Sequence, residues 1–492
     1  MKHFLKKSIC VLLSAALALS FFISAFAQTD SADDYSITSP YDAVDWETWG
    51  AYKTQLHCHT NASDGFLTIK EAIQLDYDLG YDIVAITDHG TVNKGWNKAP
   101  DLVPLMRLIK YERTQMAPID PLSDEEYNAF LTGTAKTSDG QVRGRGMLDI
   151  PQGIELNMAT PFADCHLTGY WSDYGQGLAG VFGDYETPAK EVNKAGGLTM
   201  LSHVGEYVYL NYTSDENVGK PVDERYVNKF ANIFLDNPVS CFGMGINSSA
   251  DEHTNCDRIL YDSILQKTIP NGVVPYAYCF SDSHNVESRN YAFQMLMMPS
   301  FDLDSTKTAL TEGTSFAVSH FSRGVELNGM REMDKYSIAD DCKQFDGSKN
   351  DTPMVTFIET DNENDVITVK GTDFDTITWV SNGNVIKRES VTDGTASIDL
   401  HDSALLNDVG MYVRFYITGD DGICYSQPFT VMKNGEKPAP VEVPATHDES
   451  TFLRGLVTVL DWLIFKWSPI IWSFKWFALG YNPLTQILDS FR

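Results

Sequence analysis

Basic side chains are scarce in this chain of 492 residues, where 37 lysines and arginines stand against 67 aspartates and glutamates. The formal net charge of −30 argues against nucleic acid as a partner, because a phosphate backbone is captured by a basic surface. A small phosphorylated substrate is not excluded, since bound metal ions can supply positive charge locally.

Cysteine is also sparse, and its eight positions show no tight spacing. One of them, Cys10, falls in the N-terminal segment described next, so an odd number remains. We therefore predict free or buried thiols rather than a disulfide framework. Cys58 and Cys165 each neighbour a histidine, and strand alternation turns them away from it, so we predict that both are buried packing residues.

The N-terminal residues have the features of a signal peptide. Lys2, Lys6 and Lys7 precede an apolar stretch from Ile9 to Ile23, and Ala25-Phe26-Ala27 matches a cleavage site. We predict cleavage after this motif and a secreted or cell-surface protein, with an uncleaved signal anchor as the alternative.

The C-terminal tail lacks an apolar run long enough to span a bilayer. The run between Lys466 and Lys475 falls well short of the ~20 residues that a spanning helix needs, and Pro469 interrupts it. The tail is nevertheless rich in tryptophan, which favours a peripheral association with a membrane or cell surface. A helix hairpin that docks on this protein or on a partner is the alternative.

A change of periodicity divides the chain. Strand-like and helix-like runs alternate at first, which is typical of an α/β domain, whereas later short runs are split by Asn-Gly and Asp-Gly turns. In the later part, Trp379 and Tyr412 match the core tryptophan and the tyrosine corner of immunoglobulin-like sandwiches. We predict a signal peptide at 1–27, an N-terminal lead at 28–51, an α/β domain at 52–330, a small all-β sandwich at 350–432, a Pro-rich linker at 433–450 and a Trp-rich tail at 451–492.

The first ligand-type residues come early in the α/β domain. His57 and His59 are two residues apart on a predicted strand, so both side chains point to the same face. The apolar run from Ile83 to Ile86 predicts a buried strand with Asp88 and His89 at its C-terminal end. Both strand ends therefore carry residues that can bind a metal ion.

A helix is predicted between these strands, because Thr68 and Glu71 form a capping box and Gly80 is placed to end the helix. A polar insertion then runs from 93 to 146, and a second capping box at Ser123 and Glu126 predicts a helix within it. The insertion is either a wall of a substrate pocket or a solvated excursion.

Later apolar runs carry residues of the same kind at or near their ends. A single histidine in an apolar run is most often a packed core residue, but here His, Asp and Glu recur at successive strand ends. This recurrence favours a barrel over a doubly wound sheet, because side chains from many barrel strands converge on one site. The nine residues can bind two or three divalent ions and are His57, His59, Asp64, His89, Glu155, His166, His203, Asp282 and His284.

With these residues in place, the sequence resembles the polymerase and histidinol phosphatase (PHP) superfamily of metal-dependent phosphoesterases over about residues 52–320. The matching motifs are His57-Cys58-His59, Asp64-Gly65, Thr87-Asp88-His89, Gly153-Ile154-Glu155, His166, Ser202-His203 and Ser281-Asp282-Ser283-His284. The resemblance implies a distorted (β/α)7 TIM-like barrel with two or three divalent ions, such as zinc, manganese or iron. It implies one ion held by His57, His59, Glu155 and Asp282, a second by Asp64, His89 and His284, and a third by Glu155, His166 and His203.

The resemblance further implies hydrolysis of a phosphomonoester or phosphodiester by metal-activated water. Asp88 is predicted to orient His89, or else only to cap its strand. Arg289 is predicted to clamp a phosphate, because a guanidinium fork fits phosphate oxygens, with a surface charge as the alternative. Two other functions stay open: a metal-dependent hydrolase of a non-phosphate bond such as an amide, and a cell-surface binding protein with a structural metal site.

Overall fold

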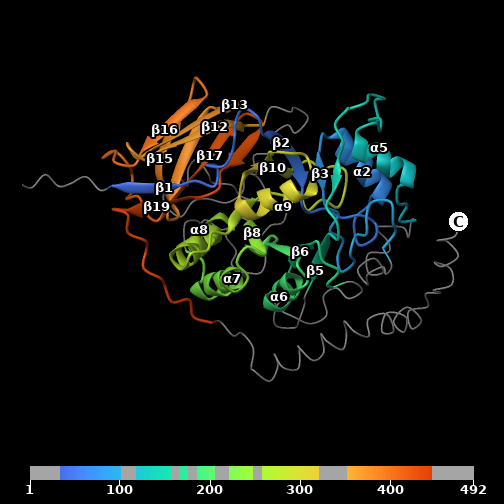
Figure 1. The fold of residues 1–492 in the computed structure, drawn as a ribbon, viewed down its shortest axis with the longest axis horizontal. Helices are drawn as coiled ribbons and strands as arrows, with labels where there is room; N and C mark the ends of the chain where they lie inside the picture. The colour runs from blue at the N-terminus through green and yellow to red at the C-terminus, as the bar shows by residue number, and fades with distance from the viewer. Residues whose placement is uncertain are drawn as a thin grey trace, which may run out of the picture.

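The computed structural model describes residues 34–100, 118–157, 166–175, 185–205, 221–247, 257–320 and 352–445. The predicted signal peptide at 1–27 and the tail at 451–492 lie outside these ranges, as do Cys165 and part of the polar insertion. Figure 1 shows an α/β region, coloured blue to yellow, beside an orange region made of strands. Among the described residues, no helix is both long enough and apolar enough to cross a membrane.

One sheet of the α/β region has five strands that follow one another in chain order. They are β5 (Ile154–Asn157), β6 (His166–Tyr170), β7 (Leu198–Leu201), β8 (Cys241–Gly245) and β9 (Tyr276–Tyr278). The β5–β6 and β6–β7 pairs are antiparallel, whereas β7, β8 and β9 are parallel. Three helices share an apolar core with this sheet: α6 (Glu186–Lys194), α7 (Glu224–Asp236) and α8 (Asp257–Thr268), which η3 (Ile269–Asn271) follows.

A second group of strands leads to the first histidines. It contains β2 (Gly50–Gln55), β3 (Ile83–Val84) and β4 (Leu148–Asp149), which are parallel, and β10 (Ala292–Met298) and β11 (Ser315–Ser319), which are antiparallel to their neighbours. The helices of this part are α2 (Ile69–Asp78), α5 (Asp124–Thr132) and α9 (Leu303–Glu312).

Two helix starts are formed as predicted. The Thr68 hydroxyl accepts from the Glu71 backbone while the Glu71 carboxylate accepts from the Thr68 backbone, and Ser123 and Glu126 form the same box at α5. The start of α6 has no such box. Tyr185 occupies the N-cap without a side-chain hydrogen bond, so the helix begins without this stabilisation.

The predicted mixed α/β architecture is confirmed, but the sheets are open in the described residues and form no clear barrel there. The outer edge of β2 is taken by β10. The outer edge of β9 is covered by side-chain amides instead of a strand: the Ala277 N–H donates to Gln427 Oε1 at 2.7 Å, and Gln427 Nε2 donates to Ala277 O at 2.8 Å. Gln294 Oε1 accepts from the Cys279 N–H at 3.2 Å. These glutamines satisfy backbone groups that a closing strand would otherwise satisfy.

The open sheets nevertheless converge. One apolar core combines Leu56, which follows β2, and Ile83 of β3 with Met200, Phe242 and Tyr278 of the five-stranded sheet. Two single bridges join the strand ends, one between Cys58 and Ser283 and one between His89 and Glu155. The ends that carry the ligand-type residues therefore lie together even though no continuous ladder closes around them.

The β region consists of two sheets with a common core. The smaller sheet has β12 (Met354–Asp361), β13 (Val366–Thr372) and β16 (Thr395–Asp399). The larger holds β14 (Thr376–Ser381), β15 (Asn384–Ser390), β17 (Tyr412–Gly419), β18 (Gly422–Tyr425) and β19 (Phe429–Lys433). Ile367 of the smaller sheet and Trp379 and Phe415 of the larger belong to one buried cluster. Because β18 pairs with β11, the larger sheet continues into the α/β region.

The N-terminal lead predicted at 28–51 is partly a strand. β1 (Tyr35–Thr38) pairs antiparallel with β19 along its whole length, and Tyr35 and Ile37 are buried. The alternation of Tyr35 and Ile37 with Ser36 and Thr38 is the pattern of a half-buried strand. The chain therefore begins its described fold inside the β region, at the extended blue strand in Figure 1.

Tyr412, which matches a tyrosine corner in the sequence, contacts the α/β region. Its hydroxyl donates to Asp262 Oδ1 on α8 at 2.6 Å, where Arg414 Nε also donates at 2.8 Å. Arg414 and Asp262 are 1% exposed each. This buried cluster ties the β region to the α/β region, and the segment after β19 adds contacts, since Asn232 Nδ2 donates to Pro444 O.

The described cysteines bear out the prediction made for them. Cys58, Cys241, Cys279 and Cys424 are all buried and free.

Candidate metal centre

All nine ligand-type residues lie among the described residues, and the fold brings them to one place. Their nitrogen and oxygen atoms form three groups in which the ligand atoms lie within 4.8 Å of one another. The groups are His57, His59, Glu155 and Asp282; His59, Asp64, His89 and His284; and Glu155, His166 and His203. This grouping matches the one that the PHP resemblance implies, except that His59 also joins the second group.

Glu155 on β5 is the centre of the cluster and is fully buried. Five imidazoles face its carboxylate. The nitrogen-to-oxygen distances are 3.6 Å from His57, 3.2 Å from His59, 2.8 Å from His89, 2.8 Å from His166 and 3.3 Å from His203. The Glu155 carboxylate thus lies within 3.6 Å of five of the six histidines in the ligand set.

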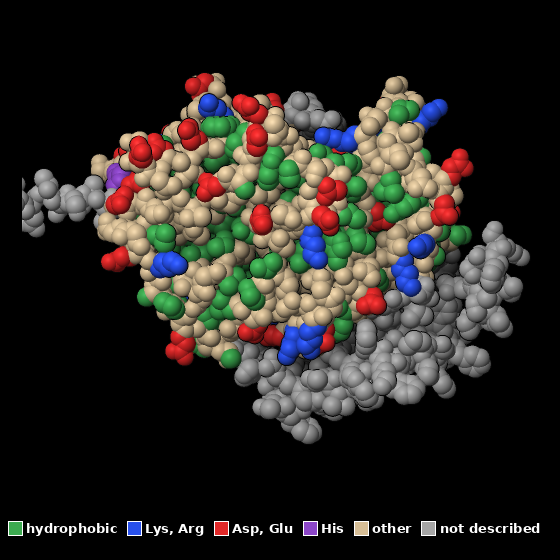
Figure 2. Space-filling model, in the orientation of Figure 1, with side chains coloured by type: hydrophobic (Ala, Val, Ile, Leu, Met, Phe, Trp, Pro, Cys, Tyr) green, Lys and Arg blue, Asp and Glu red, His purple; other side chains and the backbone are tan. Residues whose placement is uncertain are grey.

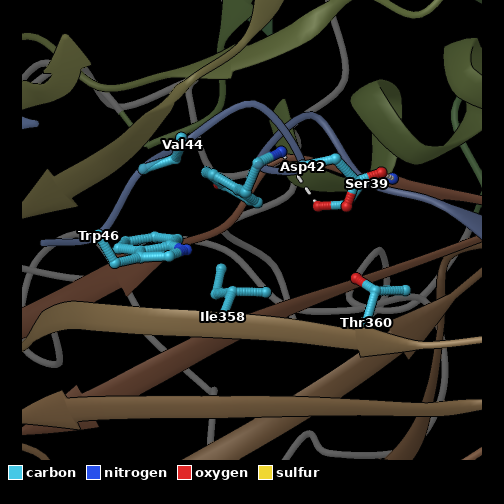
Figure 3. Close-up of a pocket in the computed structure, with 7 residues that line it drawn as sticks. Ser39, Asp42, Val44, Trp46, Ile358 and Thr360 are labelled. Carbon is cyan, nitrogen blue, oxygen red and sulfur yellow. Dashed lines mark hydrogen bonds between the residues drawn. The ribbon is translucent and has the colours of Figure 1, made fainter. Parts of the chain in front are cut away.

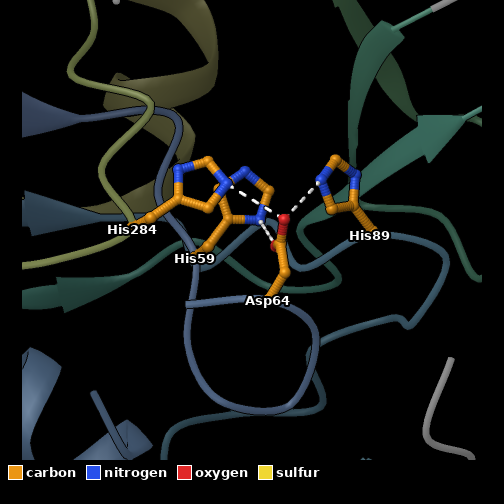
Figure 4. Close-up of side chains that lie close together, drawn as sticks. All are labelled: His59, Asp64, His89 and His284. Atoms are coloured by element: carbon orange, nitrogen blue, oxygen red, sulfur yellow. Dashed lines mark hydrogen bonds and ion pairs between the residues drawn. The ribbon is translucent and has the colours of Figure 1, made fainter. Parts of the chain in front are cut away.

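Asp64 is the centre of the second group, and Figure 4 shows three imidazoles around its carboxylate. His59 Nδ1 lies 3.4 Å from Oδ1, while His89 Nε2 and His284 Nε2 lie 3.4 and 3.2 Å from Oδ2. The loop that carries Asp64 is tightly packed, since a Cβ at Gly65 would lie 2.8 Å from the His59 carbonyl carbon. Only glycine fits at that position without a backbone shift.

Asp282 completes the first group from the other side of the site. Its Oδ1 lies 2.9 Å from His59 Nε2 and 3.3 Å from His57 Nε2. The backbone φ of Asp282 is 46° and that of His203 is 22°, both in the left-handed region. Strained backbone of this kind persists where the surrounding structure fixes it, which is typical of functional sites.

The residues of the cluster fit divalent cations. Both Glu155 oxygens and His57 Nε2 are buried and make no hydrogen bond of suitable geometry, despite the short distances around them. Three buried carboxylates beside neutral imidazoles would leave three negative charges uncompensated, which is costly in a protein interior. Imidazole and carboxylate together are the ligand set that zinc, manganese and iron accept.

The electrostatics of the cluster couple protons to ligand binding. Burial by itself would raise the pKa of Glu155, but the imidazoles of His89, His166 and His57 hold it well below its usual range. Burial and His89 depress the pKa of His59, yet the carboxylates of Asp282 and Asp64 outweigh them and raise it to about 9. Protons and metal ions would compete for the same nitrogens, so metal binding would release protons.

His166 and His284 are the most exposed of the nine ligand-type side chains. The side chains of His166 and His284 are 25% and 30% exposed, whereas those of His57, His59 and Glu155 are fully buried. His166 and His284 belong to different outer groups. A substrate entering from solvent would therefore meet these two histidines first.

Partners outside the cluster orient its members. Thr87 Oγ1 lies 2.7 Å from His57 Nδ1, which leaves Nε2 of that ring facing the carboxylates. Such a contact fixes the ring orientation of a ligating histidine. Thr87 was noted in the sequence only as part of a motif, because nothing in a single sequence shows which hydroxyl reaches which ring.

The predicted role of Asp88 in orienting His89 does not fit the structure. The Asp88 carboxylate accepts from Thr60 N at 2.8 Å, from Thr60 Oγ1 at 2.6 Å and from Ser63 Oγ at 2.6 Å. These bonds fix the turn that joins His59 to Asp64. Asp88 therefore supports the loop of a neighbouring ligand-type residue, not the ring beside it.

The predicted phosphate clamp at Arg289 does not fit either. Its side chain is fully buried, and the guanidinium donates from Nε and Nη2 to the two oxygens of Asp76 at 2.7 and 2.6 Å. A phosphate could not reach it without displacing Asp76. The sequence held a signal for this pair, because Asp76 lies on the same face of α2 as the buried residues Ile69 and Ile73.

A pocket of about 180 Å³ lies away from the histidines, between the segment after β1 and the strand β12. Figure 3 shows Trp46 and Asp42 on one side of it and Ile358 and Thr360 on the other. None of the nine ligand-type residues lines it.

The surface in Figure 2 carries acidic side chains spread over the view, with basic ones lying singly or in small groups. This distribution gives no support on that face, over the part of the chain that is described, to a nucleic-acid interface.

No protein-family model matches the sequence, and no curated protein matches it. Similar solved structures include a two-domain protein from Bacteroides vulgatus containing a predicted PHP-like metal-dependent phosphoesterase, with TM-score 0.37, 12% identity, and coverage of 81% of this chain and 98% of that chain. A lesion-specific endonuclease from Pyrococcus furiosus gives TM-score 0.29 and 13% identity over 53% of this chain and 56% of its own length. An amidohydrolase from Chromobacterium violaceum gives TM-score 0.26 and 14% identity over 47% of this chain and 87% of that chain. At such TM-scores the likeness carries no argument, so function has to rest on the site itself.

Proposed function

We propose that this protein is an exported metal-dependent phosphoesterase that hydrolyses a phosphomonoester or phosphodiester at a site of two or three divalent ions. The observation that carries the proposal is the Glu155 carboxylate, buried among five imidazoles without a hydrogen bond of its own. Divalent ions bound by such a set lower the pKa of a coordinated water and neutralise charge on phosphoryl oxygens.

The side chains have distinct parts in this proposal. Glu155 contributes to the first and third groups and is their shared ligand. His59 contributes to the first and second, so the three ion positions are linked by two residues. His166 and His284, which reach solvent, lie where the substrate phosphoryl group would approach.

The proposed substrate is a small or extracellular phosphoester. The net charge of −30 makes a polyanion an unfavourable partner and favours a small or extracellular phosphoester whose charge the ions neutralise. The secretion signal predicted at 1–27 and the tail at 451–492 favour a location outside the cell or at its surface.

The test is an assay of the mature chain, loaded separately with zinc, manganese or iron, against aryl phosphomonoesters, aryl phosphodiesters and aryl amides. Metal content would be measured in the same samples by mass spectrometry. Turnover of a phosphoester with two or three ions bound is expected. Turnover of the amide alone would favour the hydrolase of a non-phosphate bond, and full metal loading without any turnover would favour the binding protein.

A further inference from the structure

We propose that Arg289 is a positioning residue that holds the two strand ends of the metal centre at the spacing needed to bind the ions. The inference rests on the metal centre proposed above and assigns to that centre a residue whose side chain hydrogen-bonds to none of the nine ligand-type side chains.

The guanidinium reaches both strand ends at once. Besides its two bonds to Asp76, Arg289 donates from Nη1 to Ser283 Oγ at 3.1 Å and to the His59 carbonyl at 3.4 Å. His59 follows β2, and Ser283 lies between Asp282 and His284 after β9. The Arg289 side chain therefore contacts His59, which belongs to two of the ligand groups, and Ser283, which lies between the ligand-type residues Asp282 and His284.

The backbone of Arg289 strengthens the same junction. Its carbonyl accepts from Gln55 Nε2 at 3.3 Å, from Tyr81 OH at 3.1 Å and from Ser281 Oγ at 3.0 Å. Gln55 ends β2 and Ser281 precedes Asp282, so these bonds also join the two strand ends. A direct backbone link between them is the His59 N–H, which donates to Ser283 O at 2.9 Å.

The contacts explain why the residue is an arginine. A planar guanidinium can bind a carboxylate with two parallel N–H groups and still direct a third N–H elsewhere, which a lysine ammonium cannot do in the same geometry. Asp76 neutralises the buried charge and fixes the plane of the fork, so the remaining N–H groups point at Ser283 and His59. Asp76 in turn lies on α2, which makes the helix part of the support of the site.

The chain offers a matched control. Arg414 and Asp262 form a second buried pair in which Nε and Nη2 of the arginine face the two carboxylate oxygens. Both members are as well buried as Arg289 and Asp76, but they join α8 to β17 and contact none of the nine ligand-type residues through an interaction that the structure shows. Arg414→Lys therefore reports the cost of disturbing a buried pair without the positioning role.

The experiment measures the affinity of the purified full chain for Zn²⁺ by chelator competition, together with the visible absorption of Co²⁺ bound in its place. Arg289→Lys is expected to weaken metal affinity about 10–100-fold and to alter the Co²⁺ spectrum, as loss of a supporting partner commonly does. Arg414→Lys is expected to lower the melting temperature while leaving metal affinity and spectrum unchanged. Ser283→Ala, which removes one contact and no charge, is expected to weaken metal affinity several-fold.

Each other outcome overturns a defined claim. Wild-type chain that binds no ion contradicts the proposed metal centre itself. Wild-type binding with unchanged affinity and spectrum in Arg289→Lys contradicts the positioning role alone, as does equal weakening in Arg414→Lys. If Arg289→Lys does not fold, Ser283→Ala decides, and unchanged affinity in that variant overturns the inference.

Discussion

Two groups of buried charged side chains in this molecule differ in how their hydrogen bonds are met. Around Asp262, the Tyr412 hydroxyl and Arg414 Nε donate to Oδ1, and Arg414 Nη2 donates to Oδ2. Around Glu155, imidazoles lie just as close, yet neither oxygen has a hydrogen bond of suitable geometry. A buried polar atom without a partner costs roughly 1–3 kcal/mol, so the first group stabilises an interface and the second is arranged for something besides the polypeptide. Burial of charge alone therefore does not distinguish a structural contact from a site, and the arrangement of potential ligands around the charge has to be considered as well.

The largest effect is expected from Glu155→Gln, which removes the charge at the centre of the site with little change in shape. Activity should fall by more than about 1,000-fold, because a shared ligand of two groups is lost. The rise in melting temperature that added metal gives the wild type should disappear as well, since metal stabilises only a fold that binds it. Metal content and thermal unfolding in parallel measure both effects, and a variant that keeps its ions would remove Glu155 from the centre.

In contrast to Glu155→Gln, Asp262→Asn should lower the stability of the protein without removing its metal ions. Removing one partner of a buried pair leaves Arg414 uncompensated and costs about 3–5 kcal/mol of unfolding free energy. Metal content should remain that of the wild type, because the pair lies outside the three ligand groups. Denaturant unfolding measures the loss of stability, and metal analysis measures the ions retained. Loss of metal with unchanged stability would contradict a purely structural role for Asp262.

Gln427→Leu tests whether the Gln427 amide stabilises the edge of β9, where it hydrogen-bonds to the Ala277 backbone in the absence of a neighbouring strand among the described residues. The Ala277 N–H would lose its acceptor inside the core, which costs about 1–3 kcal/mol. Gln141→Leu is the control, since that side chain is exposed and its substitution should change stability by less than about 0.5 kcal/mol. Equal unfolding free energies for the two variants would show that the amide of Gln427 does not support the β9 edge.

Asp149 is intermediate between Asp262 and Glu155 in its hydrogen bonding. Its Oδ2 accepts from the Trp96 backbone N–H at 3.1 Å, while Oδ1 has no hydrogen bond of suitable geometry. Burial raises its pKa to about 7. The folded protein then holds a proton that the unfolded chain releases near pH 4, so the contribution of Asp149 to stability should fall by about 1.4 kcal/mol per pH unit as pH rises from 4 to 7.

The Asp149→Asn variant isolates this contribution. The asparagine cannot ionise and can still accept from Trp96, with Tyr127 as the titratable neighbour left in place. Stability measured at pH 5 and pH 7 should then lose the part of its pH dependence that Asp149 causes. An unchanged slope would show that Asp149 stays ionised in the folded protein.

The positions of the nine ligand-type residues could be predicted because they follow local rules. Strand alternation places His57 and His59 on one face, and His89, His203 and Asp282 end or follow apolar runs. Capping boxes at Thr68 and Ser123 are equally local, since the groups involved are three residues apart. These features need no knowledge of distant parts of the chain.

The errors about the sheet closure and about Arg289 concern partners far away in sequence. The barrel was expected because strand ends carry ligands, but Gln294 and Gln427 cover the edge that a closing strand would take, and their sequence context gives no sign of this. Arg289 was assigned to a phosphate because its partner, Asp76, lies 213 residues away. The acidic residue on the apolar face of α2 was the one available signal.

The pairing of β1 with β19 constrains the order in which the chain can fold. Thr38 and Thr430 face each other across this ladder, so Tyr35 and Ile37 stay without their partner strand until nearly the whole described chain has been made. Every ligand-type residue precedes that point, and the strand ends that carry them can meet earlier. Closing such a long loop is slow, and an unpaired edge is open to wrong pairing in the meantime. A chain that stops before β19 would therefore carry all nine ligands together with an exposed, aggregation-prone N-terminal strand.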